Sequence, residues 1–189
     1  GIIMDITLEL QKIFEKANKN FLKRDKLLLE TKVSERSLCG ALMLELYEVI
    51  KNTQYNNYYV DVEYNRNVNG KVKTFRKTIS DLEMQVVTIN CDLIIHSRGK
   101  LINDNLIALE MKKSTRAKKE KIKDKERLEC LTKEPNKDVW SYDGQVHPEH
   151  VCGYKLGIYY EIDFKKQKIY IEYYKKGYCF KYYVVEYDF

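Results

Sequence analysis

The sequence predicts a mixed α/β protein in which helices flank a central sheet. Two observations support this fold class: residues 5–50 carry apolar side chains at helical spacing, whereas from residue 58 apolar and polar side chains alternate. A third is the return of helical, strongly basic sequence over 118–132. With 189 residues, 44% of them hydrophobic, the chain is long enough to bury a core, and we expect a single domain over 1–189.

The N-terminal part predicts two amphipathic helices. In the first, over 5–30, apolar residues recur every three or four positions. The second covers 34–50, with Ser34 as its N-cap. Glu35 lies about 25° from the centre of the apolar stripe of this helix, so its carboxylate points inward. Two interpretations of Glu35 remain open: a group inside the protein binds its carboxylate, or the carboxylate complements the helix dipole.

Strands are expected along the middle of the chain. Alternation over 58–64 predicts the first strand, and the Asn-Gly pair at 69–70 is typical of a hairpin turn that leads into a second strand over 72–79. A third strand is expected over 86–96 and, after a polar turn, a fourth over 105–111.

The C-terminal part predicts a basic helix over 118–132, a loop over 133–150 and three tyrosine-rich strands. These strands are expected at 154–162, 168–174 and 179–186. Tyrosines fill half-buried sheet faces, but they are also enriched at protein interfaces. A protein-interaction domain therefore stays an alternative, with a homodimer as its extension.

Positive charge is concentrated in one segment. Residues 111–137 contain eleven lysines or arginines and five acidic residues, a net charge of +6 that equals the net charge of the whole chain. A local cationic surface of this kind attracts phosphate backbones. A solvated, lysine-rich helix fits the composition equally well.

Cysteine usage indicates a reducing compartment. The five cysteines are scattered and form no CxxC pair, which is typical of reduced thiols in a cytoplasmic protein. A zinc site that uses His147, His150 and Cys152 is the alternative, but it lacks an obvious fourth ligand. The chain has neither an apolar run long enough to span a membrane nor a secretory signal, so we expect no membrane partner.

One pair of strands is expected to bring acidic side chains together. If 86–96 and 105–111 form a hairpin centred near Leu101, Asp92 lies opposite Glu110, where cross-strand side chains are about 5 Å apart. Lys112 lies on the same face as Glu110, two residues along the strand. Two such carboxylates repel each other unless a cation or proton lies between them, and hard oxygen ligands suit Mg²⁺ or Mn²⁺.

An acidic residue two positions before a lysine occurs three times, at Glu30, Glu110 and Asp163, and only Glu110 lies at the end of an apolar strand. Asp92, followed after eighteen residues by Glu110-Met111-Lys112, resembles the motif of the PD-(D/E)xK nuclease superfamily, the restriction-endonuclease-like phosphodiesterases. The segment 34–37 resembles the first helix of the family, which often contributes a further acidic residue, and the segments 61–66 and 124–128 resemble an uncharacterised bacterial branch of it. The proline that precedes the aspartate in the family motif is replaced here by Cys91, a position that supplies no ligand.

The resemblance implies a restriction-endonuclease-like core of the order α-β-β-β-α-β over 33–163. It leaves an extra N-terminal helical extension over 1–32 and a tyrosine-rich C-terminal β-hairpin over 164–189.

The resemblance also implies roles for individual residues. Asp92 and Glu110 would hold Mg²⁺ or Mn²⁺, assisted by the Met111 carbonyl and Glu35, and Lys112 would position the attacking water. Glu63 and Lys113 are weaker candidates for supporting roles. The residues expected to contact nucleic acid are Lys113, Arg116, Lys118, Lys119 and Lys121.

The function expected from the resemblance is a metal-dependent nuclease, most simply a DNA endonuclease. Two alternatives within the same fold are an RNA-cleaving enzyme and a catalytically inactive nucleic-acid-binding or partner subunit.

Overall fold

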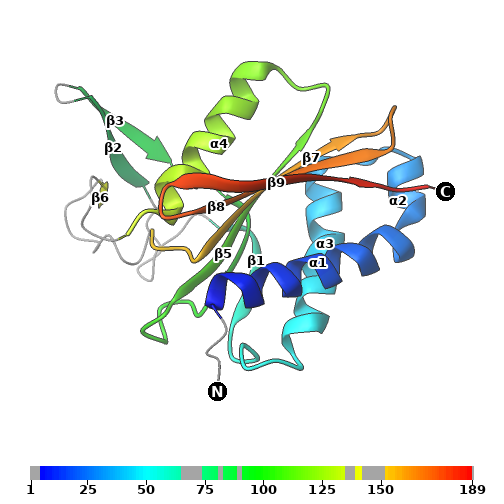
Figure 1. Ribbon diagram of the computed structural model, residues 1–189, viewed down its shortest axis with the longest axis horizontal. Coiled ribbons are helices and arrows are strands. Elements are labelled where there is room, and N and C mark those ends of the chain that lie inside the picture. Colours follow the sequence, from blue (N-terminus) through cyan, green and yellow to red (C-terminus); the bar gives the residue numbers. More distant parts are fainter. Residues whose placement is uncertain are drawn as a thin grey trace.

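The main feature of the protein is a six-stranded mixed sheet (Figure 1). The computed structural model describes residues 5–64, 74–80, 83–88, 91–134, 139–141 and 152–188. Its strands lie in the order β1-β4-β5-β7-β8-β9. Their bounds are β1 (Tyr59–Tyr64), β4 (Cys91–His96), β5 (Asn105–Lys113), β7 (Leu156–Asp163), β8 (Lys168–Lys175) and β9 (Tyr178–Glu186). Neighbouring strands are antiparallel except β5 and β7, which are parallel.

Helices cover both faces of this sheet, so the expected mixed α/β class is confirmed (Figure 1). The helices are α1 (Ile6–Arg24), α2 (Lys26–Glu30), α3 (Glu35–Ile50) and α4 (Lys118–Thr132). On one face, α1 and α3 bury Phe14 and Leu42 in a core with Leu109 of β5. On the other face, α4 buries Leu128 in a second core with Ala108 of β5.

The connection between the parallel strands β5 and β7 contains α4, which matches the predicted helix at both ends. Parallel neighbouring strands need such a crossover, because the chain has to return to the end of the sheet at which β5 began before it can run in the same direction again. A tight turn is too short for this return. At Gly157 of β7, an added Cβ would lie 2.9 Å from Cγ2 of Thr132 in α4 and 3.1 Å from Cβ of Tyr174. Helix and sheet are therefore packed closely at this glycine.

The two predicted N-terminal helices are confirmed in part. In α3, the Ser34 hydroxyl accepts a hydrogen bond from the Ser37 amide, as expected of an N-cap. The first helix is not continuous over 5–30, because α1 ends at Arg24 and α2 follows after Asp25. The backbone of Asp25 leaves the helical region at φ −106° and ψ 34°, and Leu29 beyond it is buried.

The prediction of one strand over 86–96 is wrong, because this segment forms parts of two strands that belong to different sheets. β3 (Glu83–Thr88) pairs with β2 (Thr74–Ser80), which also pairs with β6 (Val139–Ser141) in a separate three-stranded sheet. β1 pairs with β4 and not with β2, so the predicted second strand does not extend the main sheet. The Asn-Gly turn at 69–70 lies outside the described residues, and the predicted loop over 133–150 contains β6.

The tyrosine-rich tail forms the three predicted strands, and all of them belong to the main sheet. Tyr160 and Tyr173 are fully buried, and their hydroxyls donate to Asn18 and Glu15 of α1 at 2.5 and 3.0 Å. Tyr182, by contrast, is 81% exposed. The inner tyrosines therefore fill the sheet core, as one of the two interpretations expected.

Two further features concern the compartment and the membrane. None of the five cysteines, all of which lie in the described segments, forms a disulfide. His147 and His150 of the alternative zinc site lie outside the described residues. Among the helices described, none is long and apolar enough to cross a bilayer.

Candidate functional site

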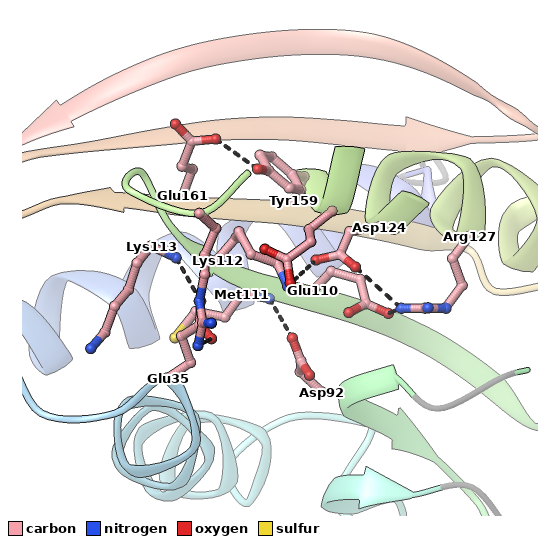
Figure 2. A network of polar contacts seen from close by, with 12 residues as sticks. Glu35, Asp92, Glu110, Met111, Lys112, Lys113, Asp124, Arg127, Tyr159 and Glu161 are labelled. Atoms are coloured by element: carbon pink, nitrogen blue, oxygen red, sulfur yellow. Dashed lines mark hydrogen bonds and ion pairs between the residues drawn. The ribbon is translucent and has the colours of Figure 1, made fainter. Parts of the chain in front are cut away.

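The β4–β5 hairpin has the register expected from the sequence. Leu93 pairs with Leu109 and Ile94 with Ala108, which is the register in which the sequence expects Asp92 to face Glu110. Oδ2 of Asp92 accepts a hydrogen bond of 2.8 Å from the Met111 amide (Figure 2). The carboxylate of Asp92 is therefore held against the end of β5.

A third carboxylate joins these two, and sequence reasoning did not identify it as a site residue. This carboxylate belongs to Asp124 of α4. One carboxylate oxygen each from Asp92, Glu110 and Asp124 lie within 4.8 Å of one another. We call these three residues the acidic triad. Glu110 is 1% exposed and Asp124 5% exposed. The spacing of α4 carried a signal, since Asp124 precedes the buried Leu128 by four residues and so lies on the same helix face.

Two cations neutralise part of the charge of the acidic triad. Nη1 of Arg127, one turn beyond Asp124 on α4, lies 2.9 Å from Oε1 of Glu110 and 3.3 Å from Oδ1 of Asp124. Nζ of Lys112 lies 3.2 Å from Oδ2 of Asp124. Three carboxylates and two cations leave the ionised cluster with a net charge of −1.

Burial and mutual repulsion make the acidic triad hard to ionise. Burial raises the pKa of Glu110 well above its usual range, and the negative charge of Asp92 adds to this, although Arg127 acts to lower it. Burial likewise raises the pKa values of Asp92 and Asp124. These carboxyl groups are therefore strong ligands for a proton or a metal cation.

Lys112 stays charged in this environment. Burial acts to lower its pKa, but the adjacent Asp124 carboxylate outweighs burial and raises the pKa above its ordinary value. Lys112 can therefore supply positive charge and hydrogen-bond donors, and it is not suited to accept a proton.

Glu35 contacts the end of β5 from the opposite helix layer. Its Oε2 accepts a hydrogen bond of 2.7 Å from the Lys113 amide, and its Oε1 lies 3.1 Å from Nη2 of Arg116 (Figure 2). Of the two interpretations left open, binding by an internal group is the one observed. Glu35 is not one of the three carboxylates whose oxygens converge.

A hollow beside Asp92 opens between α3 and β5. It encloses about 270 Å³ and brings Asp92 and Glu35 to the same surface as three basic side chains. Its lining consists of Ser34, Glu35, Arg36, Cys39, Val62, Asp92, Lys113 and Arg116. An anionic ligand in this hollow would therefore contact both the basic side chains and Asp92.

The predicted basic contacts fall into three groups. Lys113 and Arg116 line the hollow, whereas Lys118 and Lys119 are exposed at the start of α4. The side chain of Lys121 is half-buried. Its Nζ donates a hydrogen bond to the Ser114 carbonyl at 2.7 Å and lies 3.4 Å from Oε2 of Glu161.

The remaining candidates are Met111 and Glu63. The Met111 backbone belongs to the site through its amide, and its side chain is buried, with Sδ 3.8 Å from Sγ of Cys39. Glu63 lies in β1, and its side chain is outside the described part of the structure.

Comparisons with protein-family models, with curated proteins and with solved structures found no match. The chemistry of the site therefore has to be inferred from its own residues.

Proposed function

We propose that this protein is a metal-dependent nuclease of the PD-(D/E)xK type that hydrolyses phosphodiester bonds, with DNA as its substrate. The observation that carries the proposal is the convergence of Asp92, Glu110 and Asp124 within 4.8 Å, with the Lys112 ammonium group 3.2 Å from one of them. Buried carboxylates that repel one another are retained at a cost in stability, which is typical of a site that binds a cation.

The order of elements supports the same proposal. Along the chain, α3, β1, β4, β5, α4 and β7 follow one another around the site, with β1, β4 and β5 antiparallel and β7 parallel to β5. We take β2, β3 and β6, which form a second sheet, as additions to the α-β-β-β-α-β order that the sequence resemblance implies.

The donor set of the acidic triad fits a divalent cation. Carboxylate oxygens are the ligands that Mg²⁺ and Mn²⁺ prefer, and each member of the acidic triad supplies one. When bound there, the ion would supply Lewis-acid stabilisation of a phosphate oxygen and lower the pKa of a water molecule.

The side chains around the triad have separate tasks in this reaction. The Lys112 ammonium, kept charged by Asp124, would orient the attacking water and stabilise the negative charge that develops on the phosphate. Lys113 and Arg116, in the hollow beside Asp92, would bind backbone phosphate groups without reading sequence. Water attack on phosphorus breaks one P–O ester bond, and the leaving oxygen takes up a proton.

Cleavage assays with matched variants test the proposal. We expect wild-type protein with Mg²⁺ or Mn²⁺ to cleave plasmid DNA, and Glu110→Gln and Lys112→Ala each to lose about 100-fold or more in rate because a charge acting on the transition state is removed. The controls are Glu30→Gln and Lys165→Ala, which alter exposed residues in the other two acid-x-lysine sequences.

The outcome also separates the alternatives. Equal cleavage by wild type and both site variants contradicts the site assignment. Salt-sensitive DNA binding without cleavage in any metal favours the inactive binding subunit, and cleavage restricted to RNA favours the RNA-cleaving alternative.

A further inference from the structure

The guanidinium group of Arg127 lies where it contacts two members of the acidic triad. Nη1 reaches Glu110 at 2.9 Å and Asp124 at 3.3 Å (Figure 2). The side chain of Arg127 is 20% exposed, whereas that of Glu110 is 1% exposed. Its Nε is buried and makes no hydrogen bond within the part of the chain that is described. Arg127 is thus bound through one end of its guanidinium group and reaches the triad from its more exposed side.

This contact compensates for charge that the fold itself creates. Three carboxylates within 4.8 Å of one another, two of them buried, repel strongly in a medium that screens poorly. Lys112 is bound to Asp124, so among the described residues Arg127 is the cation that pairs with Glu110. Without Arg127, an ionised Glu110 would be a buried charge with no ion-pair partner in that part of the chain, a situation that strongly destabilises folded proteins.

The same contact opposes metal binding. A divalent cation bound by Glu110 and Asp124 would lie beside the Arg127 guanidinium, and two cations that close repel. Arg127 also binds Oε1 of Glu110, one of the two carboxylate oxygens that this residue offers to a metal.

We propose that Arg127 is an internal counter-ion for this site: it neutralises Glu110 and Asp124 when no metal is bound, and a divalent cation displaces it. The inference rests on the proposed function, because it takes the acidic triad as the metal site. Arg127 then lowers the affinity for metal while it stabilises the metal-free fold.

Metal binding by charge variants of Arg127 tests the inference. In calorimetric titrations with Mn²⁺, Arg127→Gln should bind Mn²⁺ at least tenfold more tightly than wild type, whereas Arg127→Lys, which keeps the charge, should stay close to wild type. Without metal, Arg127→Gln should melt below wild type, and saturating Mn²⁺ should raise its Tm by more than it raises that of wild type. The control is Lys125→Gln, since Lys125 on the same helix pairs with Glu172 instead.

A measurement on wild-type protein covers the case in which Arg127→Gln does not fold. The Nε–H signal of Arg127 in nitrogen-15 NMR spectra, assigned by its loss in Arg127→Lys, should shift on titration with Mg²⁺. An unchanged signal at saturating Mg²⁺ overturns the inference.

Failure of the inference and failure of the proposed function give different results. If wild type binds Mn²⁺, Glu110→Gln does not, and Arg127→Gln binds with wild-type or weaker affinity, Arg127 is not a counter-ion and the metal site stands. If neither wild type nor Arg127→Gln binds Mn²⁺, the metal site is absent and the inference falls with it.

Discussion

Glu110 is a buried carboxylate whose neighbours act on its pKa in opposite directions. Its side chain is 1% exposed, and its pKa is raised well above the usual range by burial and by Asp92, with Arg127 acting in the opposite direction. Asp92 and Asp124 share the upward shift. A proton and a metal ion therefore compete for the same oxygens.

This competition predicts how metal affinity depends on pH. Since the pKa values of Asp92 and Glu110 lie above their ordinary values of 3.8 and 4.5, protons begin to displace metal at a higher pH than at an exposed carboxylate site. As pH falls, affinity for Mn²⁺ should therefore begin to fall at a higher pH than it does for an exposed carboxylate site. Calorimetric titration at several pH values measures this, with a peptide that carries exposed carboxylates as the reference, and a loss of affinity at the same pH in both would contradict the raised pKa values.

Single residues also show which parts of the site the sequence can predict. Asp92 and Glu110 could be paired in advance because a hairpin is local and its side chains alternate strictly. Asp124 and Arg127 could not, because their contribution depends on how α4 packs against the sheet. In the sequence they lie among many other charges of α4, and only the packed helix shows that Asp124 is buried.

At the scale of elements, α4 packs closely against the sheet. It crosses β7 at Gly157, where an added Cβ would lie 2.9 Å from the Thr132 side chain and 3.1 Å from Cβ of Tyr174. Thr132 also accepts a hydrogen bond from the Gly177 amide at 3.1 Å, which ties the end of α4 to the turn between β8 and β9. Because α4 also carries Asp124 and Arg127, its position on the sheet determines the geometry of the site.

Two glycine substitutions test this packing. Gly157→Ala should reduce the free energy of unfolding by about 1–3 kcal/mol because the new methyl group overlaps atoms that have little room to move. The matched control is Gly40→Ala in α3, where an added Cβ meets nothing within 4 Å and alanine favours the helix by about 0.5–1 kcal/mol. Urea unfolding measures both, and similar effects of the two substitutions would contradict this account of the contact.

Elements with strong local signals were predicted well, and the others were not. The cap at Ser34 and the alternating tail strands follow from short-range rules, so α3, β8 and β9 appear close to their expected bounds. The break at Asp25 and the division of 86–96 between β3 and β4 depend on tertiary contacts. Alternation identifies a strand but not the neighbour that it pairs with, which is why β2 was expected in the wrong sheet.

Charge is distributed unevenly over the whole molecule. The segment 111–137 has a net charge of +6, and its described part runs from the end of β5 through α4, where Lys118 and Lys119 are exposed. The helix α1 lies on the other face of the sheet and carries exposed lysines of its own (Figure 1). Under the proposed function, nucleic acid would contact the exposed start of α4 as well as the hollow between α3 and β5.

Salt-dependent binding distinguishes the two faces. The double variant Lys118→Glu/Lys119→Glu should weaken binding to duplex DNA and reduce the dependence of log K on log salt by about 0.9 for each phosphate that the variant no longer neutralises. The control is Lys12→Glu/Lys16→Glu on α1, which makes the same change in net charge. Fluorescence anisotropy at several salt concentrations measures the slopes, and equal weakening in both double variants would mean that net charge alone, and not the α4 face, drives binding.

The acidic triad draws one carboxylate each from β4, β5 and α4. A nascent chain that has formed only the β4–β5 hairpin holds two of the three, and it has neither Arg127 nor a docked α4 to offset their repulsion. Any reactivity that needs all three oxygens therefore begins only after α4 has docked on the sheet. Incompletely synthesised or partly unfolded copies of the chain would lack that reactivity.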